Sequence, residues 1–184
     1  MSESASHVDH ILKPLEDYKP RNLHGFGLRQ SAVLIPILNR AQNQIIFTLR
    51  ASHLRTHAGQ ISFPGGRIES DETPWQAALR EAEEEIGIQP QHVRQVARLD
   101  DVLSPRGYHV KCFVGVVDHF EPRINHDEVE RLVTADFDEL FDSDLHSTRL
   151  WKKVSKVHYF DFKDGLVWGV TGKITWHLRQ ALSR

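Results

Sequence analysis

The stretch Gly66–Ile88, which reads GRIESDETPWQAALREAEEEIGI, carries the strongest structural and chemical signals in this chain. Four glutamates fall within positions 81–85. Residues three and four apart share one face of a helix, so Glu81, Glu84 and Glu85 should project together. Like charges on one face cost stability unless a cation offsets them. A solvated acidic face is the alternative interpretation of such a helix.

The residues around these glutamates predict a short amphipathic helix from about Pro74 to Ile86. Thr73 is the expected N-cap, and Gln76 would close a capping box. Gly87 is the expected C-cap. Oxygen-rich clusters suit hard cations such as Mg²⁺ or Mn²⁺, and Mg²⁺ typically binds through one or two carboxylates plus substrate phosphates. The sequence therefore indicates a divalent-cation site on this helix.

The same stretch resembles the Nudix box, whose pattern is G-x5-E-x7-R-E-U-x-E-E-x-G-U with U aliphatic. Only Ala82, at an aliphatic position, is a weak match. The residues that match in register are Gly66, Glu72, Arg80, Glu81, Glu84, Glu85, Gly87 and Ile88. The resemblance implies a hydrolase that cleaves a nucleoside diphosphate linked to another moiety. It also implies the Nudix fold, a mixed β-sheet sandwiched between α-helices.

The resemblance further implies roles for the residues of the box. Glu81, Glu84 and Glu85 would hold Mg²⁺ or Mn²⁺. Arg80 would orient a glutamate, and Glu72 would support the geometry of the loop and helix.

A second match lies just upstream, where Ile46–Ala51 reads IFTLRA and is followed by Arg55, Gly59 and the FPGG of positions 63–66. These residues resemble the signature of the coenzyme A pyrophosphatase branch, which reads roughly LLTxR[SA]-x3-R-x3-G-x3-FPGG. This resemblance implies cleavage of coenzyme A or its thioesters to 3′,5′-ADP and phosphopantetheine, or its acylated form. The implied substrate-binding residues are Arg50, Arg55, Gly65 and Gly66. The two arginines suit bidentate contacts with phosphate, although a strand-end Arg50 and an exposed Arg55 are the alternative.

Glu128, in the sequence Asn125–Glu128, is a candidate for an additional metal ligand or a general base. The alternative is a solvated acidic turn, because single carboxylates in loops are usually solvated.

Two other functions stay open alongside the coenzyme A interpretation. One is hydrolysis of another nucleoside diphosphate derivative, such as ADP-ribose, a dinucleotide or a nucleoside triphosphate. The other is a non-catalytic ligand sensor on the same scaffold, since a fold does not determine function. A sensor would be expected to lose some of the box glutamates, whereas this chain carries all of them.

Length and composition indicate one α/β (α+β) domain over residues 1–184, with an N-terminal extension at 1–25 and the box at 66–88. The apolar content of 40% is enough for a core. The net charge of −2 gives no basic field typical of nucleic-acid binding.

The single cysteine, Cys112, lies in an apolar run and is expected to be a buried strand residue. One cysteine excludes an internal disulfide and fits a reducing compartment. No apolar segment approaches the ~20 residues of a membrane span, and no signal-peptide core is apparent. We therefore expect a cytoplasmic protein whose partner is a small nucleotide substrate, not nucleic acid or a membrane. The sequence does not determine the oligomeric state, and a homodimer is one alternative.

Hydrophobic patterns predict the remaining elements. A surface helix is expected before about Tyr18, and a C-terminal helix at about 171–182. A short helix is expected at 136–140, and a weaker strand or turn at 127–133. The expected strands are 31–38, 44–49, 61–63, 93–100, 111–117 and 157–162, with a hairpin between the first two.

Overall fold

The computed structural model describes residues 7–24, 27–54, 56–152 and 155–184. The helices are α1 (His7–Leu12), α2 (Pro74–Ile86) and α3 (Gly169–Leu182), with 3₁₀ turns η1 (Lys13–Leu15), η2 (Pro90–His92) and η3 (Phe137–Phe141). The strands are β1 (Arg29–Leu38), β2 (Gln44–Arg50), β3 (Ile61–Ser62), β4 (Gly65–Arg67), β5 (Val93–Arg98), β6 (Val102–Leu103), β7 (Tyr108–Val117), β8 (Val129–Asp136), β9 (His146–Trp151), β10 (Ser155–Phe162) and β11 (Gly165–Val167).

The larger sheet is mixed and has the central order β3-β2-β1-β7-β5. Strands β1 and β7 run parallel over ten residue pairs, from Arg29 and Tyr108 to Leu38 and Val117. The other pairings are antiparallel: β4 joins β1, β8 joins β2, and β6 joins β7. Residues 39–43 connect β1 and β2 as the predicted hairpin.

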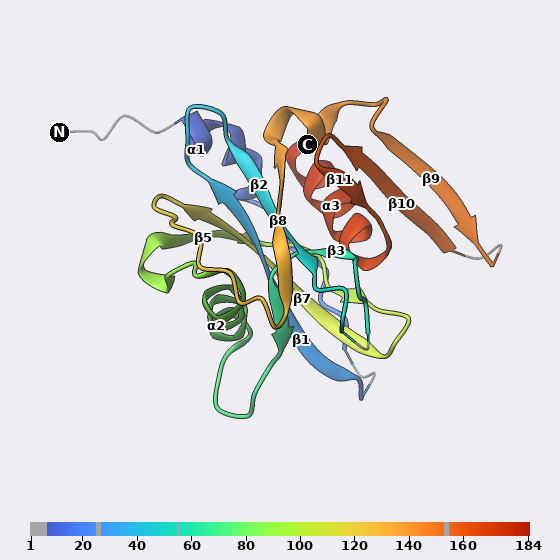
Figure 1. The fold of residues 1–184 in the computed structure, drawn as a ribbon. Helices are drawn as coiled ribbons and strands as arrows, with labels where there is room; N and C mark the ends of the chain where they lie inside the picture. The colour runs from blue at the N-terminus through green and yellow to red at the C-terminus, as the bar shows by residue number, and fades with distance from the viewer. Residues whose placement is uncertain (1–6, 25–26, 55, 153–154) are drawn as a thin grey trace.

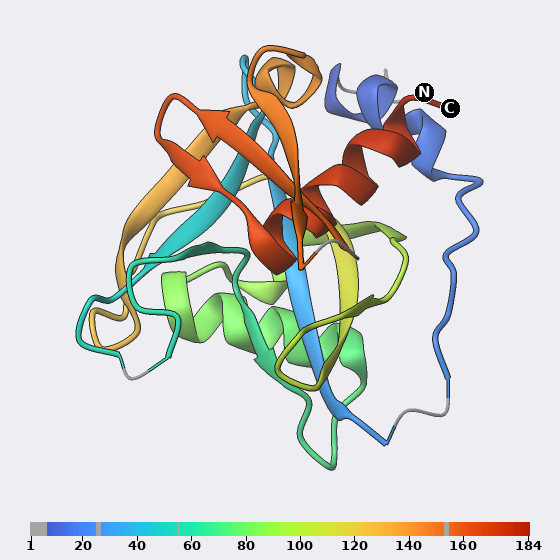
Figure 2. The same cartoon turned by 90° about the vertical axis from the view of Figure 1, so that its right-hand side faces the viewer.

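Two hydrophobic cores lie on opposite faces of this sheet. Residues of β1 alternate between them, because successive side chains of a strand point to opposite faces. Ala32 and Leu34 pack toward α2, whereas Ile35 and Ile37 pack toward the side that carries α3. The sheet thus has α2 on one side and α1 and α3 on the other, as the predicted sandwich requires (Figures 1 and 2).

A second, three-stranded sheet in the order β11-β10-β9 lies beside α3 (Figure 1). It joins the larger sheet near β3, where a β-carbon on Gly165 would overlap the side chain of Ile61. This contact brings the C-terminal layer to the strand that leads into the glycine pair at 65–66.

Most expected elements are confirmed, and α2 has the predicted bounds. The N-terminal helix α1 is a short surface helix, as predicted: His7 and His10 are exposed, whereas Val8 and Leu12 pack into the core beside α3. The expected weak strand or turn at 127–133 is the eight-residue strand β8, in which exposed charged residues mask the apolar positions. Strands β4 and β9 were not predicted: glycines dominate the first, and polar or exposed residues the second.

Cys112 is fully buried, as predicted, and its burial raises the pKa of the thiol.

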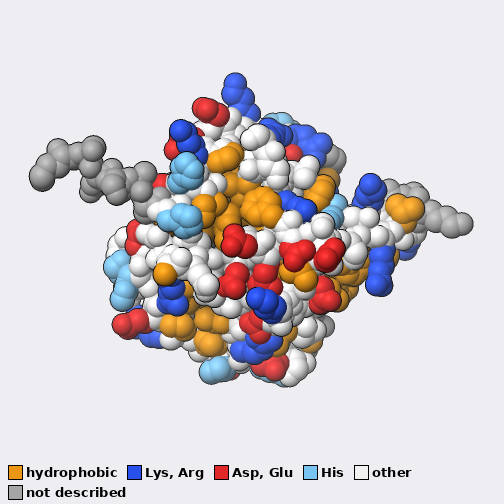
Figure 3. Space-filling view, turned by 90° about the horizontal axis from the view of Figure 1, so that it is seen from above, with side chains coloured by type: hydrophobic (Ala, Val, Ile, Leu, Met, Phe, Trp, Pro, Cys, Tyr) orange, Lys and Arg blue, Asp and Glu red, His pale blue; other side chains and the backbone are white. Residues whose placement is uncertain are grey.

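Within the described ranges, no helix is long and apolar enough to cross a membrane. The face seen in Figure 3 carries acidic side chains beside a hydrophobic area, with Lys and Arg side chains interspersed.

Candidate active site

Helix α2 is defined at both ends by local contacts. The Thr73 hydroxyl accepts a hydrogen bond from the N–H of Gln76, and the Gln76 side chain accepts one from the N–H of Thr73. This is the predicted capping box, with Pro74 at the first helical turn. Gly87 ends the helix at φ +82°, and its N–H reaches the carbonyls of Ala82 and Glu83. The glutamates therefore sit on a helix with a fixed register.

The glycine pair brings the backbone of β4 directly against this helix. A β-carbon on Gly66 would overlap the carboxylate of Glu81. Gly65, at φ +155°, would overlap the Ala32 carbonyl and Val33 if it carried a side chain. The glycines are therefore required by close approach, and Gly66 leaves room for the Glu81 carboxylate next to the chain.

Arg80 connects three glutamates, of which Glu72 lies in the loop before α2 and Glu81 and Glu84 lie on the helix. Its Nε and Nη2 donate to the two carboxylate oxygens of Glu72 at 3.1 and 2.9 Å. Its Nη1 donates to Glu81 Oε1 at 2.9 Å and to Glu84 Oε2 at 3.2 Å. Nη2 also donates to the Arg67 carbonyl. The bonds from Arg80 lower the pKa of Glu72, so the guanidinium holds this loop and two of the candidate ligands together.

Glu85 lies in a different environment from Glu84. It is only 2% exposed, whereas the Glu84 side chain is 56% exposed. Glu85 Oε1 lies 3.8 Å from Arg50 Nη1, and its buried Oε2 has no hydrogen-bond partner among the residues that the structure describes. Burial raises the pKa of Glu85 to about 8, although Arg50 and the N–H of Gly65 act in the opposite direction. The three glutamates therefore do not share one exposed face: Glu85 turns into the interior.

Glu128 is placed at the same site by the chain that precedes β8. Its N–H donates to the Asn125 carbonyl at 3.0 Å, and its carbonyl accepts from the N–H of Ala51 at 2.9 Å. Burial is the main cause that raises the pKa of both Glu81 and Glu85, and the charge of the Glu128 carboxylate acts in the same direction. Glu128 is thus a half-buried neighbour of the cluster, not an isolated solvated side chain.

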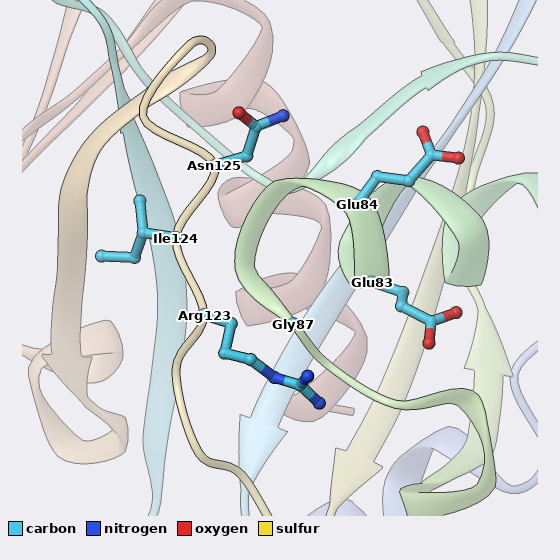
Figure 4. Close-up of a pocket in the computed structure, with 6 residues that line it drawn as sticks. All are labelled: Glu83, Glu84, Gly87, Arg123, Ile124 and Asn125. Atoms are coloured by element: carbon cyan, nitrogen blue, oxygen red, sulfur yellow. The ribbon is translucent and has the colours of Figure 1, made fainter.

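A polar pocket of about 510 Å³ borders the cluster (Figure 4). Its wall opposite the helix is the segment 123–125, which is fixed because the N–H groups of Arg123 and Asn125 donate to the carbonyls of Ile86 and Glu85, both at 2.9 Å. A β-carbon on Gly87 would lie 2.8 Å from the Cβ of Arg123, so this glycine also permits the approach of the segment. Sequence reasoning did not identify Arg123 or Asn125, because no local pattern marks a segment that is positioned by a helix end.

The structure describes three of the four candidate substrate-binding residues. Arg50 faces Glu85. Gly65 and Gly66 lie where β4 passes close to β1 and to Glu81 of α2. Arg55 lies outside the described residues. The structure thus brings together Arg50, Gly65, Gly66, Arg80, Glu81, Glu84, Glu85 and Glu128.

The carboxylate oxygens of Glu81, Glu84 and Glu85 are the groups here that could bind a divalent cation. In the part of the chain that the structure describes, no three His, Cys, Asp or Glu groups already converge as a metal site. Arg80 forms hydrogen bonds with both Glu81 and Glu84. Among the described residues, the buried Oε2 of Glu85 has no hydrogen-bond partner, and an unpaired buried carboxylate oxygen is costly. Carboxylate oxygens of this kind fit Mg²⁺ or Mn²⁺.

Comparison with known proteins identifies the class. The family model described as "NUDIX domain" matches residues 28–164. A protein of Salmonella typhimurium named "Uncharacterized Nudix hydrolase NudL" is 36% identical over 187 residues, which cover 95% of this chain and 94% of that protein. The chain therefore belongs to the Nudix family, whose hydrolases act on phosphoric anhydrides.

Solved structures agree with the fold. A MutT/nudix family protein from Enterococcus faecalis aligns with a TM-score of 0.59 at 13% identity, over 99% of this chain and 76% of that chain. The NUDIX domain of Shewanella oneidensis NrtR, solved as a complex with ADP ribose, aligns with a TM-score of 0.50 at 18% identity. That alignment covers 70% of this chain and 84% of that chain. At these identities the likeness shows the Nudix fold alone.

Proposed function

We propose that the protein is a divalent-cation-dependent pyrophosphohydrolase that cleaves coenzyme A or its thioesters to 3′,5′-ADP and phosphopantetheine, or its acylated form. The observation that carries the hydrolase part is the carboxylate cluster on α2, above all the buried Glu85 oxygen that no group in the described part of the chain satisfies. The choice of coenzyme A rests on the IFTLRA and FPGG stretches, which precede this cluster in the chain and supply Arg50 and the glycine pair.

In this proposal the chain's own residues divide the chemistry. Glu81, Glu84 and Glu85 hold the cation, which when bound neutralises phosphate oxygens and lowers the pKa of a water molecule. Glu128 is the candidate base that takes a proton from the attacking water. The water oxygen bonds to one phosphorus atom, and the bridging oxygen leaves with the other phosphate.

Arg80 acts in this proposal as a positioning residue. Its four hydrogen bonds to carboxylates keep Glu72, Glu81 and Glu84 close together while no cation is bound. When Glu81 and Glu84 bind the cation, the bidentate pair with Glu72 can persist, because it uses a separate edge of the guanidinium. The loop and helix then keep their geometry.

The second candidate is a Nudix hydrolase of another nucleoside diphosphate derivative. The ADP ribose in the NrtR complex, a protein with the same fold, makes ADP-ribose a sensible competitor to test. A non-catalytic sensor on this scaffold is a remote alternative, because all the box glutamates are present. We further propose a cytoplasmic location, which the free and fully buried Cys112 supports.

The test is incubation of the protein with coenzyme A and Mg²⁺ or Mn²⁺, with products identified by mass. Appearance of 3′,5′-ADP and phosphopantetheine, lost when a chelator is added, is the expected result. ADP-ribose and a nucleoside triphosphate are run in parallel. Faster turnover of either than of coenzyme A would replace the substrate while keeping the reaction class, whereas no turnover of any by a folded sample would favour the sensor.

A further inference from the structure

Arg50 is held at the edge of the site by its backbone and not by its side chain. Its N–H donates to the Gln60 carbonyl, and its own carbonyl accepts from the N–H of Gly59, both at 3.0 Å. The pairing of β2 with β8 shifts register between Leu49 and Arg50. The next residue, Ala51, binds the carbonyl of Glu128. The backbone of Arg50, from which its side chain extends, is therefore fixed between α2 and the segment that carries Glu128.

The guanidinium of Arg50 is held far more loosely than that of Arg80. Arg80 makes hydrogen bonds of 2.9–3.2 Å to three carboxylates. Arg50 approaches Glu85 only to 3.8 Å, and within the described residues its side chain makes no hydrogen bond. The Arg50 side chain is also 23% exposed, so part of it is accessible to solvent. Its contact with Glu85 is one of charge without directional bonding, which makes it easy to exchange.

The same carboxylate that faces Arg50 is the one with an unsatisfied buried oxygen. A divalent cation on Glu85 and a guanidinium beside it would repel each other. An anionic diphosphate brought in next to the cation would in turn attract the guanidinium, which suits phosphate oxygens. The long arginine side chain can follow either partner without movement of its backbone.

We propose that Arg50 is an exchangeable cation of the site, which stands beside Glu85 before the divalent cation binds and then meets the anionic diphosphate of the substrate. This inference rests on the proposed function. It assigns Arg50 two successive partners and predicts that the cation binds before the substrate. It also means that Arg50 opposes cation binding and favours substrate binding, a pair of effects that a purely structural residue would not produce.

The experiment measures Mn²⁺ affinity by calorimetry, without substrate, in the wild type and in Arg50→Gln. Loss of a positive charge beside Glu85 should tighten Mn²⁺ binding by about tenfold. Arg50→Lys, which keeps the charge, should bind Mn²⁺ within about twofold of the wild type. The matched control is Arg131→Gln, which removes the same charge from β8 at a side chain that pairs with Asp164, and it should leave the affinity unchanged.

Steady-state kinetics with coenzyme A at saturating Mn²⁺ give the second readout. Arg50→Gln should raise KM by about tenfold, while Arg131→Gln leaves KM unchanged. Tighter Mn²⁺ binding together with weaker substrate binding is the expected signature. Unchanged or weaker Mn²⁺ binding in Arg50→Gln would contradict the proposal that Arg50 exchanges Glu85 for the substrate diphosphate.

Two controls keep this result separate from other failures. Arg50→Met is a second uncharged variant. Of Arg50→Gln and Arg50→Met, the one used is the one that unfolds cooperatively with the melting temperature of the wild type. If the wild type itself binds no Mn²⁺ and cleaves nothing, the proposed function fails. If the wild type binds Mn²⁺ and cleaves coenzyme A but both Arg50 variants match its affinity, only the present inference fails.

Discussion

Asp101 and Glu85 are the two most deeply buried carboxylates among the described residues, and the protein supports them in opposite ways. Asp101 is 1% exposed and accepts hydrogen bonds from Lys111 Nζ and His109 Nε2 at 2.7 Å, from the N–H of Leu23 at 2.9 Å, and from Arg98. Burial alone would raise its pKa, but these bonds outweigh burial and hold the pKa well below its usual range.

Glu85 is equally buried and receives almost none of this support. One loose ion pair faces it, one of its oxygens has no hydrogen-bond partner among the described residues, and its pKa is raised to about 8. Asp101 is satisfied by the protein and ties the N-terminal segment to β6 and β7. Glu85 lacks such support, which is what the proposed cation site requires of it.

Replacement of Glu85 by Gln should have the largest effect on activity. Loss of a cation ligand removes several kcal/mol of transition-state stabilisation, which is on the order of a thousandfold in kcat. The fold should remain, because the neutral side chain is cheaper to bury than a poorly paired carboxylate. Turnover assays and thermal melts check both parts.

The matched control for Glu85→Gln is Glu83→Gln. It removes the same charge two residues away on the same helix, at a side chain that points away from Glu84 (Figure 4). This control should keep near-normal turnover. Near-normal turnover in Glu85→Gln would show that Glu85, like Asp101, has a structural role only.

Glu128→Gln should lower kcat by roughly a hundredfold, because general-base catalysis typically contributes ~10²–10⁴-fold. The neighbouring backbone contacts to Ala51 and Asn125 do not involve the side chain and should persist. Kinetics over a range of Mn²⁺ concentrations separate a base from a ligand, since loss of a ligand is partly rescued by more metal. Full activity in this variant would remove Glu128 from the mechanism.

Asp101→Asn should produce the converse of Glu85→Gln. It leaves Lys111 and Arg98 without their buried partner, and the loss of one member of such a pair costs about 3 kcal/mol of folding stability. Denaturant unfolding measures this loss. At a temperature where the variant is folded, kcat should stay within about threefold of the wild type. A stability equal to that of the wild type would show that the hydrogen bonds and ion pairs of Asp101 do not stabilise the fold, which would contradict the contrast drawn with Glu85.

The smallest effect concerns a buried histidine, His158, which has no anionic partner among the described residues. It lies 3.1 Å from His146, stacks on Trp176, and has its pKa lowered to about 4 by burial and by cationic neighbours. The unfolded chain takes up this proton near pH 6.5, before the folded chain does. Stability should therefore be complete above pH 6.5 and fall by about 2 kcal/mol as the pH drops toward 4.

Unfolding free energies measured across this range test the effect of His158. His158→Asn should show a shallower decline than the wild type, even if it is less stable at pH 7. A wild-type stability that does not change between pH 6.5 and 4 would contradict the assignment.

The sequence could predict the parts of the site that depend on local chemistry. The bounds of α2 follow from Thr73, Pro74 and Gly87, whose capping contacts involve only nearby residues. The burial of Glu85 could not be predicted, because it depends on β2 and β4 approaching the helix from elsewhere in the chain.

The same limit applies to the strands. β1 and β7 carry enough apolar residues to be recognised alone, whereas β4 is a strand because it pairs with β1. β9 is a strand because it pairs with β10, and five of its six residues are exposed. Strands that depend on a partner leave little trace in the sequence.

The most direct measurement is a crystal structure of the protein grown with Mn²⁺, with the metal located by its anomalous scattering. The contrast between the two carboxylates predicts Mn²⁺ bound to Glu85 Oε2 together with Glu81 and Glu84, and an undisturbed Asp101 with its hydrogen bonds in place. Mn²⁺ bound elsewhere, or no metal at Glu85 at a concentration that supports turnover, would contradict it.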